Sequence, residues 1–314
     1  MSVLVYTESW GGSFRKSTYE AVSYASETAR LLNTNVIALA FGNESDDELL
    51  KLGNYGANKV FSAKEIEKGD SKSTSELLAI ISNNSNIIVF ASTYTSKMTA
   101  PRLAAKIKSG IVSNVISLPS SFTPLKIKRK SFSGKAIEET IINTEKAIIL
   151  LASNAYGLVE CESNCEIEKI DHKSNTNITI KNQEIASGKV SLSEAEIVIS
   201  AGRGLKGPEN WGMIEELAKL LNAATACSKP VSDIGWRPHG EHVGQTGIVI
   251  APNLYIAVGI SGAIQHLAGV NSSKTIVVVN TDAEAPFFKA ADYGIVGDAF
   301  DVIPKLIEEI KRIQ

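Results

Sequence analysis

The first half of the chain alternates short apolar runs with longer stretches of helical periodicity. The apolar runs predict buried strands at residues 3–7, 36–41 and 87–91. The periodic stretches predict helices at residues 15–32, 73–81 and 101–108. Ser73 and Glu76 have the spacing of a capping box at the start of the second helix. Strands separated by helices of this length are typical of βαβ units in a parallel sheet.

The middle of the chain follows another pattern. Alternating polar and apolar side chains at 126–142 predict antiparallel strands, and the apolar run at 147–152 predicts one more buried strand. Residues 160–189 are mostly polar, with one predicted strand at 177–180. We interpret this polar segment as the connection between two domains, residues 1–188 and residues 189–314.

The second half restarts the alternation of strands and helices. Apolar runs predict strands at residues 196–200, 248–251, 255–260, 275–279 and 293–296. Helical periodicity covers residues 211–221 and 300–312. No internal repeat of 20–50 residues is present, so the sequence predicts an α/β protein built from two α/β domains.

Composition narrows the class of protein. The chain has 314 residues, 44% of them hydrophobic, and its 32 Lys+Arg balance 34 Asp+Glu. This balance argues against a dedicated nucleic-acid binder, which is usually clearly basic. Three cysteines are too few for a disulfide scaffold and favour a reducing compartment. The N-terminus resembles neither a signal peptide nor a transit peptide, so we expect a cytoplasmic protein, with a mature mitochondrial form left open.

One long uncharged run and several cysteines and histidines are present, but they predict neither a membrane span nor a metal site. Residues 248–270 carry no charged side chain, but Pro252, Asn253 and several glycines interrupt the run, which favours a strand, a turn and a helix. Cys161 and Cys165 lack the Cys-x-x-Cys spacing, and the four histidines form no ligand motif. We therefore expect no membrane insertion and no metal.

Candidate chemistry lies where predicted strands end. The apolar run that ends near Gly259 continues into Ser261-Gly262-Ala263 and a helix, where glycine lets a backbone approach a ligand. Ser261 could cap that helix or form a hydrogen bond with the same ligand. Further strand-end or loop features are Gly202-Arg203-Gly204, the turn 243–247, the segment 226–229, Asn280 and Asp298. Each of them alone is compatible with a structural turn. Because ligands of open α/β sheets bind outside the carboxyl ends of the strands, the set together favours a nucleotide-like ligand.

These segments resemble the alpha subunit family of the electron transfer flavoproteins. The resemblance rests on residues 202–206, 243–247, 255–269 and 291–298 and runs from about residue 197 to residue 310. It is weaker earlier, where 100–106 and 132–136 are the recognisable pieces. The resemblance implies an N-terminal nucleotide-hydrolase-like parallel-sheet domain and a C-terminal doubly wound FAD-binding domain.

The resemblance also implies which residues bind FAD. Arg203 would lie by the pyrophosphate, Thr246 would donate a hydrogen bond to flavin N5, and His266 would provide a cation at the pyrimidine edge near O2. Asn280, Asp298 and the Ala299 backbone would bind the adenosine end. Lys229 stands where the family commonly has Arg, and it lacks the planar fork of Arg. The full predicted set is Arg203, Ser228, Lys229, Val243, Gly244, Gln245, Thr246, Ser261, Gly262, Ala263, Ile264, Gln265, His266, Asn280, Asp298 and Ala299.

The function that the resemblance implies is electron carriage and not an enzyme activity with its own substrate. The chain would pair with a beta subunit that holds AMP, accept electrons from acyl-CoA-type dehydrogenases of fatty acid beta-oxidation, and pass them to a membrane quinone oxidoreductase. A flavin-bifurcating carrier, with a second FAD in the beta subunit, is an alternative. A stand-alone NAD(P)-dependent oxidoreductase is an alternative from another class, against which the sequence shows no evident acid/base pair that could polarise a substrate.

Overall fold

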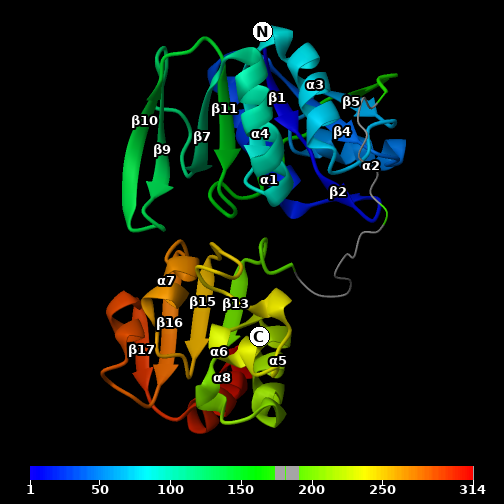
Figure 1. Ribbon diagram of the computed structural model, residues 1–314. Helices are drawn as coiled ribbons and strands as arrows, with labels where there is room; N and C mark the ends of the chain where they lie inside the picture. The colour runs from blue at the N-terminus through cyan, green and yellow to red at the C-terminus, as the bar shows by residue number, and fades with distance from the viewer. Residues whose placement is uncertain (174–180, 182–190, 314) are drawn as a thin grey trace. The chain divides into compact units, whose positions relative to one another are not determined.

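The structure is a computed structural model that describes residues 1–173, 181 and 191–313 (Figure 1). It divides into two compact units, which are described separately: Met1–Ser131 with Ile137–Ile185, and Phe132–Ala136 with Ala186–Gln314. The predicted boundary between residues 188 and 189 and the strand predicted at 177–180 lie outside the described residues.

The first unit is built on one mainly parallel sheet (Figure 1). Its strands follow the order β10-β9-β7-β11-β6-β1-β4-β5-β12, with β8 beside β9. Each neighbouring pair from β7 to β12 is parallel, whereas β9 is antiparallel to β7 and β8, as the alternation at 126–142 predicts. The strands are β1 Ser2–Tyr6, β4 Asn35–Phe41, β5 Lys59–Ala63, β6 Ser85–Ala91, β7 Gly110–Val115, β8 Ser121–Phe122, β9 Leu125–Ser131, β10 Ala136–Ile142, β11 Ala147–Leu151 and β12 Glu166–Lys169.

Helices cover both faces of this sheet. Val3 and Val5 of β1 pack into one core with α1, while Leu4 and Tyr6 pack into the other with α3 and α4, as the twofold alternation of a strand requires. A hairpin of β2 and β3 follows β1. The elements are α1 Lys16–Leu31, α2 Asp46–Leu50, α3 Ser71–Ile81, α4 Tyr94–Ile107, β2 Ser9–Trp10 and β3 Ser13–Phe14.

Three local predictions in this unit were wrong. The α3 helix is capped by Asp70, whose side chain accepts from the N–H groups of Lys72 and Ser73, so Ser73 is already helical and forms no capping box. Helix α4 begins at Tyr94 and not at 101, because Thr93 caps it, and Pro101 lies inside the helix. The segment predicted as a polar connection contains β12, an edge strand that pairs with β5.

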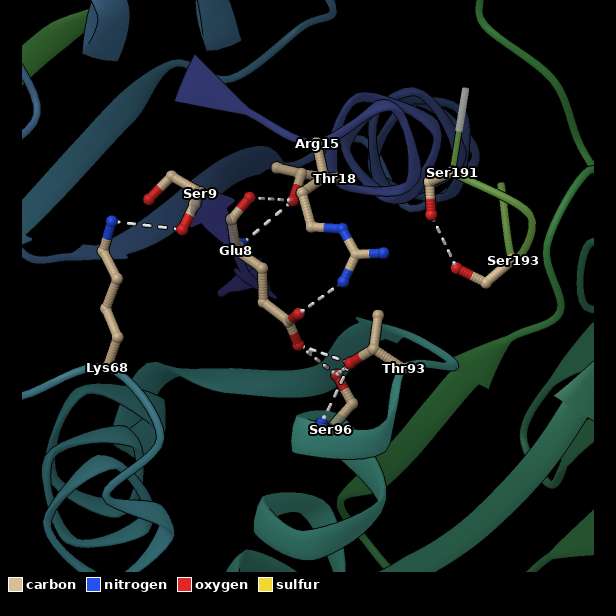
Figure 2. Close-up of polar contacts among 9 residues, drawn as sticks. All are labelled: Glu8, Ser9, Arg15, Thr18, Lys68, Thr93, Ser96, Ser191 and Ser193. Atoms are coloured by element: carbon tan, nitrogen blue, oxygen red, sulfur yellow. Dashed lines mark hydrogen bonds and ion pairs between the residues drawn. The ribbon is translucent and has the colours of Figure 1, made fainter. Parts of the chain in front are cut away.

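The carboxyl ends of β1 and β6 meet around a buried glutamate (Figure 2). Glu8 accepts hydrogen bonds from the hydroxyls of Thr93 and Ser96 at the start of α4, and it forms an ion pair with Arg15 at 3.4 Å. The Glu8 and Arg15 side chains are only 7% and 9% exposed. This network joins the first strand, the first helix and α4 in the interior of the unit.

The second unit is a doubly wound α/β domain (Figure 1). Its strands are parallel in each pair and follow the order β14-β13-β15-β16-β17. Helices α5 and α8 pack on one face, and Val243, Val270 and Phe287 belong to the core on the other. The elements are β13 Ile197–Ala201, β14 Ala224–Cys227, β15 Leu254–Val258, β16 Thr275–Asn280, β17 Tyr293–Val296, α5 Gly212–Leu220, α6 Lys229–Asp233, α7 Ile264–Val270 and α8 Ala299–Ile313.

The strand predicted at 248–251 is absent. Ile248 makes only an isolated bridge to Val243, and the following residues run without regular structure. Within the described residues, no helix is both long and apolar enough to cross a membrane, and no cluster of His, Cys, Asp or Glu could hold a metal ion.

Candidate functional site

The candidate site lies at the carboxyl ends of β13 and β15. Because β13 stands between β14 and β15, the chain changes direction across the sheet there, which is the topological switch point where such folds bind ligands. The loops after the two strands touch: the Gly204 N–H donates to the Gly259 carbonyl at 3.1 Å. A Cβ at Gly204 would lie 2.6 Å from the Gly259 Cα, so this approach requires glycine.

A cavity of about 460 Å³ opens at this switch point. Its volume falls within the range of small-molecule and cofactor sites. The predicted residues that line it are Arg203, Ser228, Lys229, Val243, Gly244, Gln245, Thr246, Ser261, Ala263, Gln265, His266 and Asn280. The structure adds Gly204, Pro230, His242, Gly259, Ile260 and Asp282 to the lining. Segments far apart in the sequence are thus brought to one cavity, as the strand-end argument predicts.

Four predicted residues are not among those that line the cavity: Gly262, Ile264, Asp298 and Ala299. Gly262 is buried against Phe287, and Ile264 is 72% exposed. Asp298 accepts a hydrogen bond from the Phe300 N–H at 3.0 Å and pairs with Lys206 at 3.3 Å, so in this structure its carboxylate serves the start of α8. The Phe300 N–H and the Lys206 ammonium together lower the pKa of Asp298.

The exposed side of the cavity carries two cationic side chains, Arg203 and Lys229. Lys229 begins α6 and pairs with Asp233 one turn later, at 2.8 Å to both carboxylate oxygens. Among the described residues, the Arg203 guanidinium forms no ion pair or side-chain hydrogen bond. Arg203 is therefore the cation that is available to an anionic ligand without breaking an existing ion pair.

The turn that carries Gln245 and Thr246 is anchored to α7. The Gln245 N–H donates to the Gln265 carbonyl at 2.7 Å, and the Gly244 N–H donates to the Ile248 carbonyl at 3.3 Å. Both the Gln245 and Thr246 residues are exposed and line the cavity. The backbone is thus fixed while the amide and hydroxyl groups remain accessible to a ligand.

Helix α7 begins two residues later than it would if Ser261 were its cap. Its N-cap residue is Ala263, so Ser261 does not cap it. The Ser261 carbonyl instead accepts from the Phe287 N–H at 3.1 Å, which ties this loop to the segment after β16. Asn280 holds the neighbouring loop, because its side-chain amide donates to the Ile260 carbonyl at 2.9 Å.

His266 forms the buried side of the cavity. Its Nε2 shares a hydrogen bond of 2.8 Å with the hydroxyl of Tyr255, a fully buried residue of β15, and its ring packs edge-on against Phe287. Burial, with a smaller contribution from His242, lowers the pKa of His266 to about 4. The cation that the resemblance implies at this position is therefore a neutral imidazole at pH 7 in the chain alone.

The sequence places His242 in a loop close to the glycine turn, with a tuning role at the site as the less favoured interpretation, and His242 is not in the predicted set. It is 7% exposed and lines the cavity beside that turn. Its position directly before the Val243–Gly247 segment is the one signal in the sequence that points to it.

Comparisons with known proteins agree with this geometry. Residues 3–175 match the electron transfer flavoprotein domain, and residues 191–271 match the electron transfer flavoprotein FAD-binding domain. The chain is 35% identical to the electron transfer flavoprotein subunit alpha of Bacillus subtilis (strain 168), over 99% of this chain and 98% of the relative. The chain belongs to the electron transfer flavoprotein alpha subunit family.

Other alpha subunits match at similar levels. That of Syntrophomonas wolfei is 34% identical over 98% of each chain. That of Paracoccus denitrificans is 33% identical over 98% of this chain and 99% of the relative. The match to members of one family thus extends over both units of this alpha subunit.

The residues at the switch point fit the flavin nucleotide that the FAD-binding domain implies. Arg203 can neutralise part of a pyrophosphate, and Gln245 and Thr246 offer polar groups to a heterocycle. The glycines of the two touching loops leave backbone in place of side chains where a ligand would approach. Bound FAD would supply the redox chemistry, while the chain supplies position and electrostatics.

Proposed function

We propose that this alpha subunit is a single-electron carrier that works as a heterodimer with a beta subunit. Electrons would come from acyl-CoA-type dehydrogenases of fatty acid beta-oxidation and go to a membrane quinone oxidoreductase. The chain would act in the cytoplasm, without membrane insertion, and would convert no substrate of its own. AMP in the beta subunit belongs to the same proposal.

The observation that carries the proposal is the cavity at the switch point of the second unit. The cavity brings to one place the Arg203 guanidinium, which pairs with none of the described residues, an accessible amide and hydroxyl, and a buried imidazole. Among the described residues that line it, Asp282 is the single carboxylate, so the lining offers no pair of carboxylates for general acid and base catalysis. Such a lining favours holding a redox group over converting a substrate.

Each side chain has a distinct part in that function. Arg203 would bind and orient the anionic part of the cofactor. Thr246 and Gln245 would hold polar edges of the ring, and the Tyr255 hydroxyl keeps the His266 ring in one orientation. His266 would present a neutral ring nitrogen near the cofactor at pH 7, because burial suppresses its protonation.

The test is to co-express the chain with its beta subunit and count the FAD and AMP released by denaturation. One FAD and one AMP per heterodimer would support the proposal. Two FAD and no AMP would favour the flavin-bifurcating carrier instead. A pair that retains no flavin even after reconstitution with FAD would overturn both. Electron transfer from a reduced acyl-CoA dehydrogenase then tests the proposed donor separately.

A further inference from the structure

His242 lies between the end of strand β14 and the cavity. Its backbone forms a parallel bridge with Cys227 at the end of β14, and its carbonyl accepts from the Ile248 N–H at 2.8 Å. The side chain is almost fully buried, yet it contributes to the cavity lining. His242 therefore has a fixed backbone and forms part of the lining of the ligand site.

The glycine turn that carries Gln245 and Thr246 packs against the His242 ring. A Cβ at Gly247 would lie 2.8 Å from Nδ1 of His242, and a Cβ at Gly244 would lie 3.4 Å from Nε2. Both ring nitrogens are thus next to the turn. A change in charge on this imidazole acts directly on the backbone that presents Gln245 and Thr246 to the cavity.

Several titratable groups face His242 from the surrounding elements. Lys229 and Asp233 lie on α6, His239 lies in the segment before His242, and His266 lies on α7. Cys227 of β14 is a neutral thiol, because burial raises its pKa to about 12. Burial first, and then Lys229 and His239, lower the pKa of His242, while Asp233 raises it. The remaining charged groups that line the cavity are Arg203 and Asp282.

We propose that His242 is a second imidazole of the redox site, which takes up a proton when an electron enters the cavity. This inference rests on the proposed function, since it requires a flavin in that cavity. The electron comes from the reduced donor protein, and the proton comes from water and forms an N–H bond on the free ring nitrogen of His242. The proton leaves a hydronium ion of the solvent, whose O–H bond breaks as the N–H bond forms and which remains as water, so one negative and one positive charge enter the site together.

The physical basis is the position of His242 relative to His266. An added negative charge in the cavity favours the charged form of any imidazole nearby. His266 is held by Tyr255 and its pKa is lowered to about 4, so its pKa would have to rise by several units before the ring is protonated at pH 7. His242 lies beside the turn that carries Gln245 and Thr246, and its ring is not held by the Tyr255 hydroxyl, so we assign the proton uptake to His242.

The experiment compares the FAD-loaded heterodimer with its His242→Gln and His239→Gln variants. His239 is exposed, does not line the cavity and contacts Ser232, so it is a matched histidine control. The one-electron reduction potential is measured by spectroelectrochemistry between about pH 5.5 and 9. Coupling of one proton to one electron changes the equilibrium constant tenfold per pH unit, or 59 mV.

We expect the wild-type and His239→Gln proteins both to show this additional slope, at slightly higher pH in His239→Gln because His239 lowers the pKa of His242, and His242→Gln to lose it. An unchanged slope in His242→Gln, with FAD bound and reducible, would overturn the inference while leaving the proposed function intact. If His242→Gln fails to retain FAD, NMR titration of His242 in the wild-type heterodimer decides the question. A pKa of His242 that rises on flavin reduction supports the inference, and an identical pKa in both redox states refutes it.

Discussion

Gly259 gives a direct test of how the site is built. Its φ is +61°, and a Cβ there would lie 2.8 Å from the Cα of Gly204, a backbone atom that cannot rotate away. The left-handed backbone conformation costs a non-glycine residue about 1–2 kcal/mol, and forcing a methyl group into packed backbone costs about 1–3 kcal/mol more. We expect Gly259→Ala to lower the free energy of unfolding by about 2–5 kcal/mol.

Gly212→Ala is the matched control in the same unit. Gly212 begins α5 with φ of −53°, and nothing lies within 4 Å of the position of its Cβ. Alanine there removes backbone freedom from the unfolded chain, so we expect stabilisation by up to about 1 kcal/mol. The two substitutions add the same methyl group and differ only in backbone conformation and neighbours.

The measurement is urea unfolding of the flavin-free full chain, because bound FAD would add its own stabilisation. FAD binding is then followed by the quenching of flavin fluorescence. Gly259→Ala should both unfold at lower urea and bind FAD more weakly, since the loops after β13 and β15 must separate. Equal unfolding midpoints for Gly259→Ala and Gly212→Ala would refute the argument that this contact requires glycine.

Three further results are expected. The pKa of His266 lies below its unfolded value of about 6.5, so the free energy of unfolding of the flavin-free chain should be highest above that pH and fall by about 3 kcal/mol toward pH 4. Unfolding curves of His266→Gln should lack this additional dependence on pH. Asp70→Ala should destabilise the chain by about 1 kcal/mol through loss of the α3 cap, whereas Glu76→Ala should stay within about 0.5 kcal/mol, and the opposite order would restore the capping box. Glu8→Ala should cost about 3 kcal/mol in chemical unfolding because it removes a buried partner of Arg15, Thr93 and Ser96, against little change for the surface variant Glu27→Ala; similar values for the two would contradict the network in Figure 2.

The sequence predicts best those strands that are buried on both faces. Continuous apolar runs indicate β1, β6, β11 and β15, because helices cover both sides of each sheet. The prediction misses β5, β7 and β8. It also misses β14, which has four residues, and β12, an edge strand in which Ile167 is the one apolar residue. Neither strand has enough apolar length to differ from a loop, so only pairing with its neighbour defines it.

Helix starts show the same limit of local patterns. The Ser73–Glu76 spacing fits a capping box, but Asp70 lies three residues earlier and its carboxylate accepts two backbone N–H groups. The choice between the two caps depends on where the preceding loop places the chain, which the local sequence does not contain. Pro101 likewise favours a helix start, yet α4 accommodates it after Thr93 caps the helix eight residues before it.

The site is predictable to the extent that it depends on topology. Carboxyl ends of parallel strands meet, so Arg203, Gln245, Ser261 and Asn280 could be assigned to one cavity from sequence position. Contacts between side chains could not be predicted in this way. The pairing of Tyr255 with His266 and the closure of the glycine turn over His242 depend on tertiary packing, and no spacing in the sequence encodes them.

The charge of the cavity follows from which groups are buried. Its permanent positive charge lies on the exposed side, at Arg203 and at Lys229, whose charge Asp233 partly neutralises. Its buried side carries imidazoles that burial keeps neutral at pH 7. On the buried side, a bound group that gains an electron therefore meets imidazoles whose charge can change in response, while the fixed cations lie on the exposed side. The electrostatics of this alpha subunit should accordingly be judged by proton uptake at the histidines on reduction, because the resting charge of the buried side is close to zero.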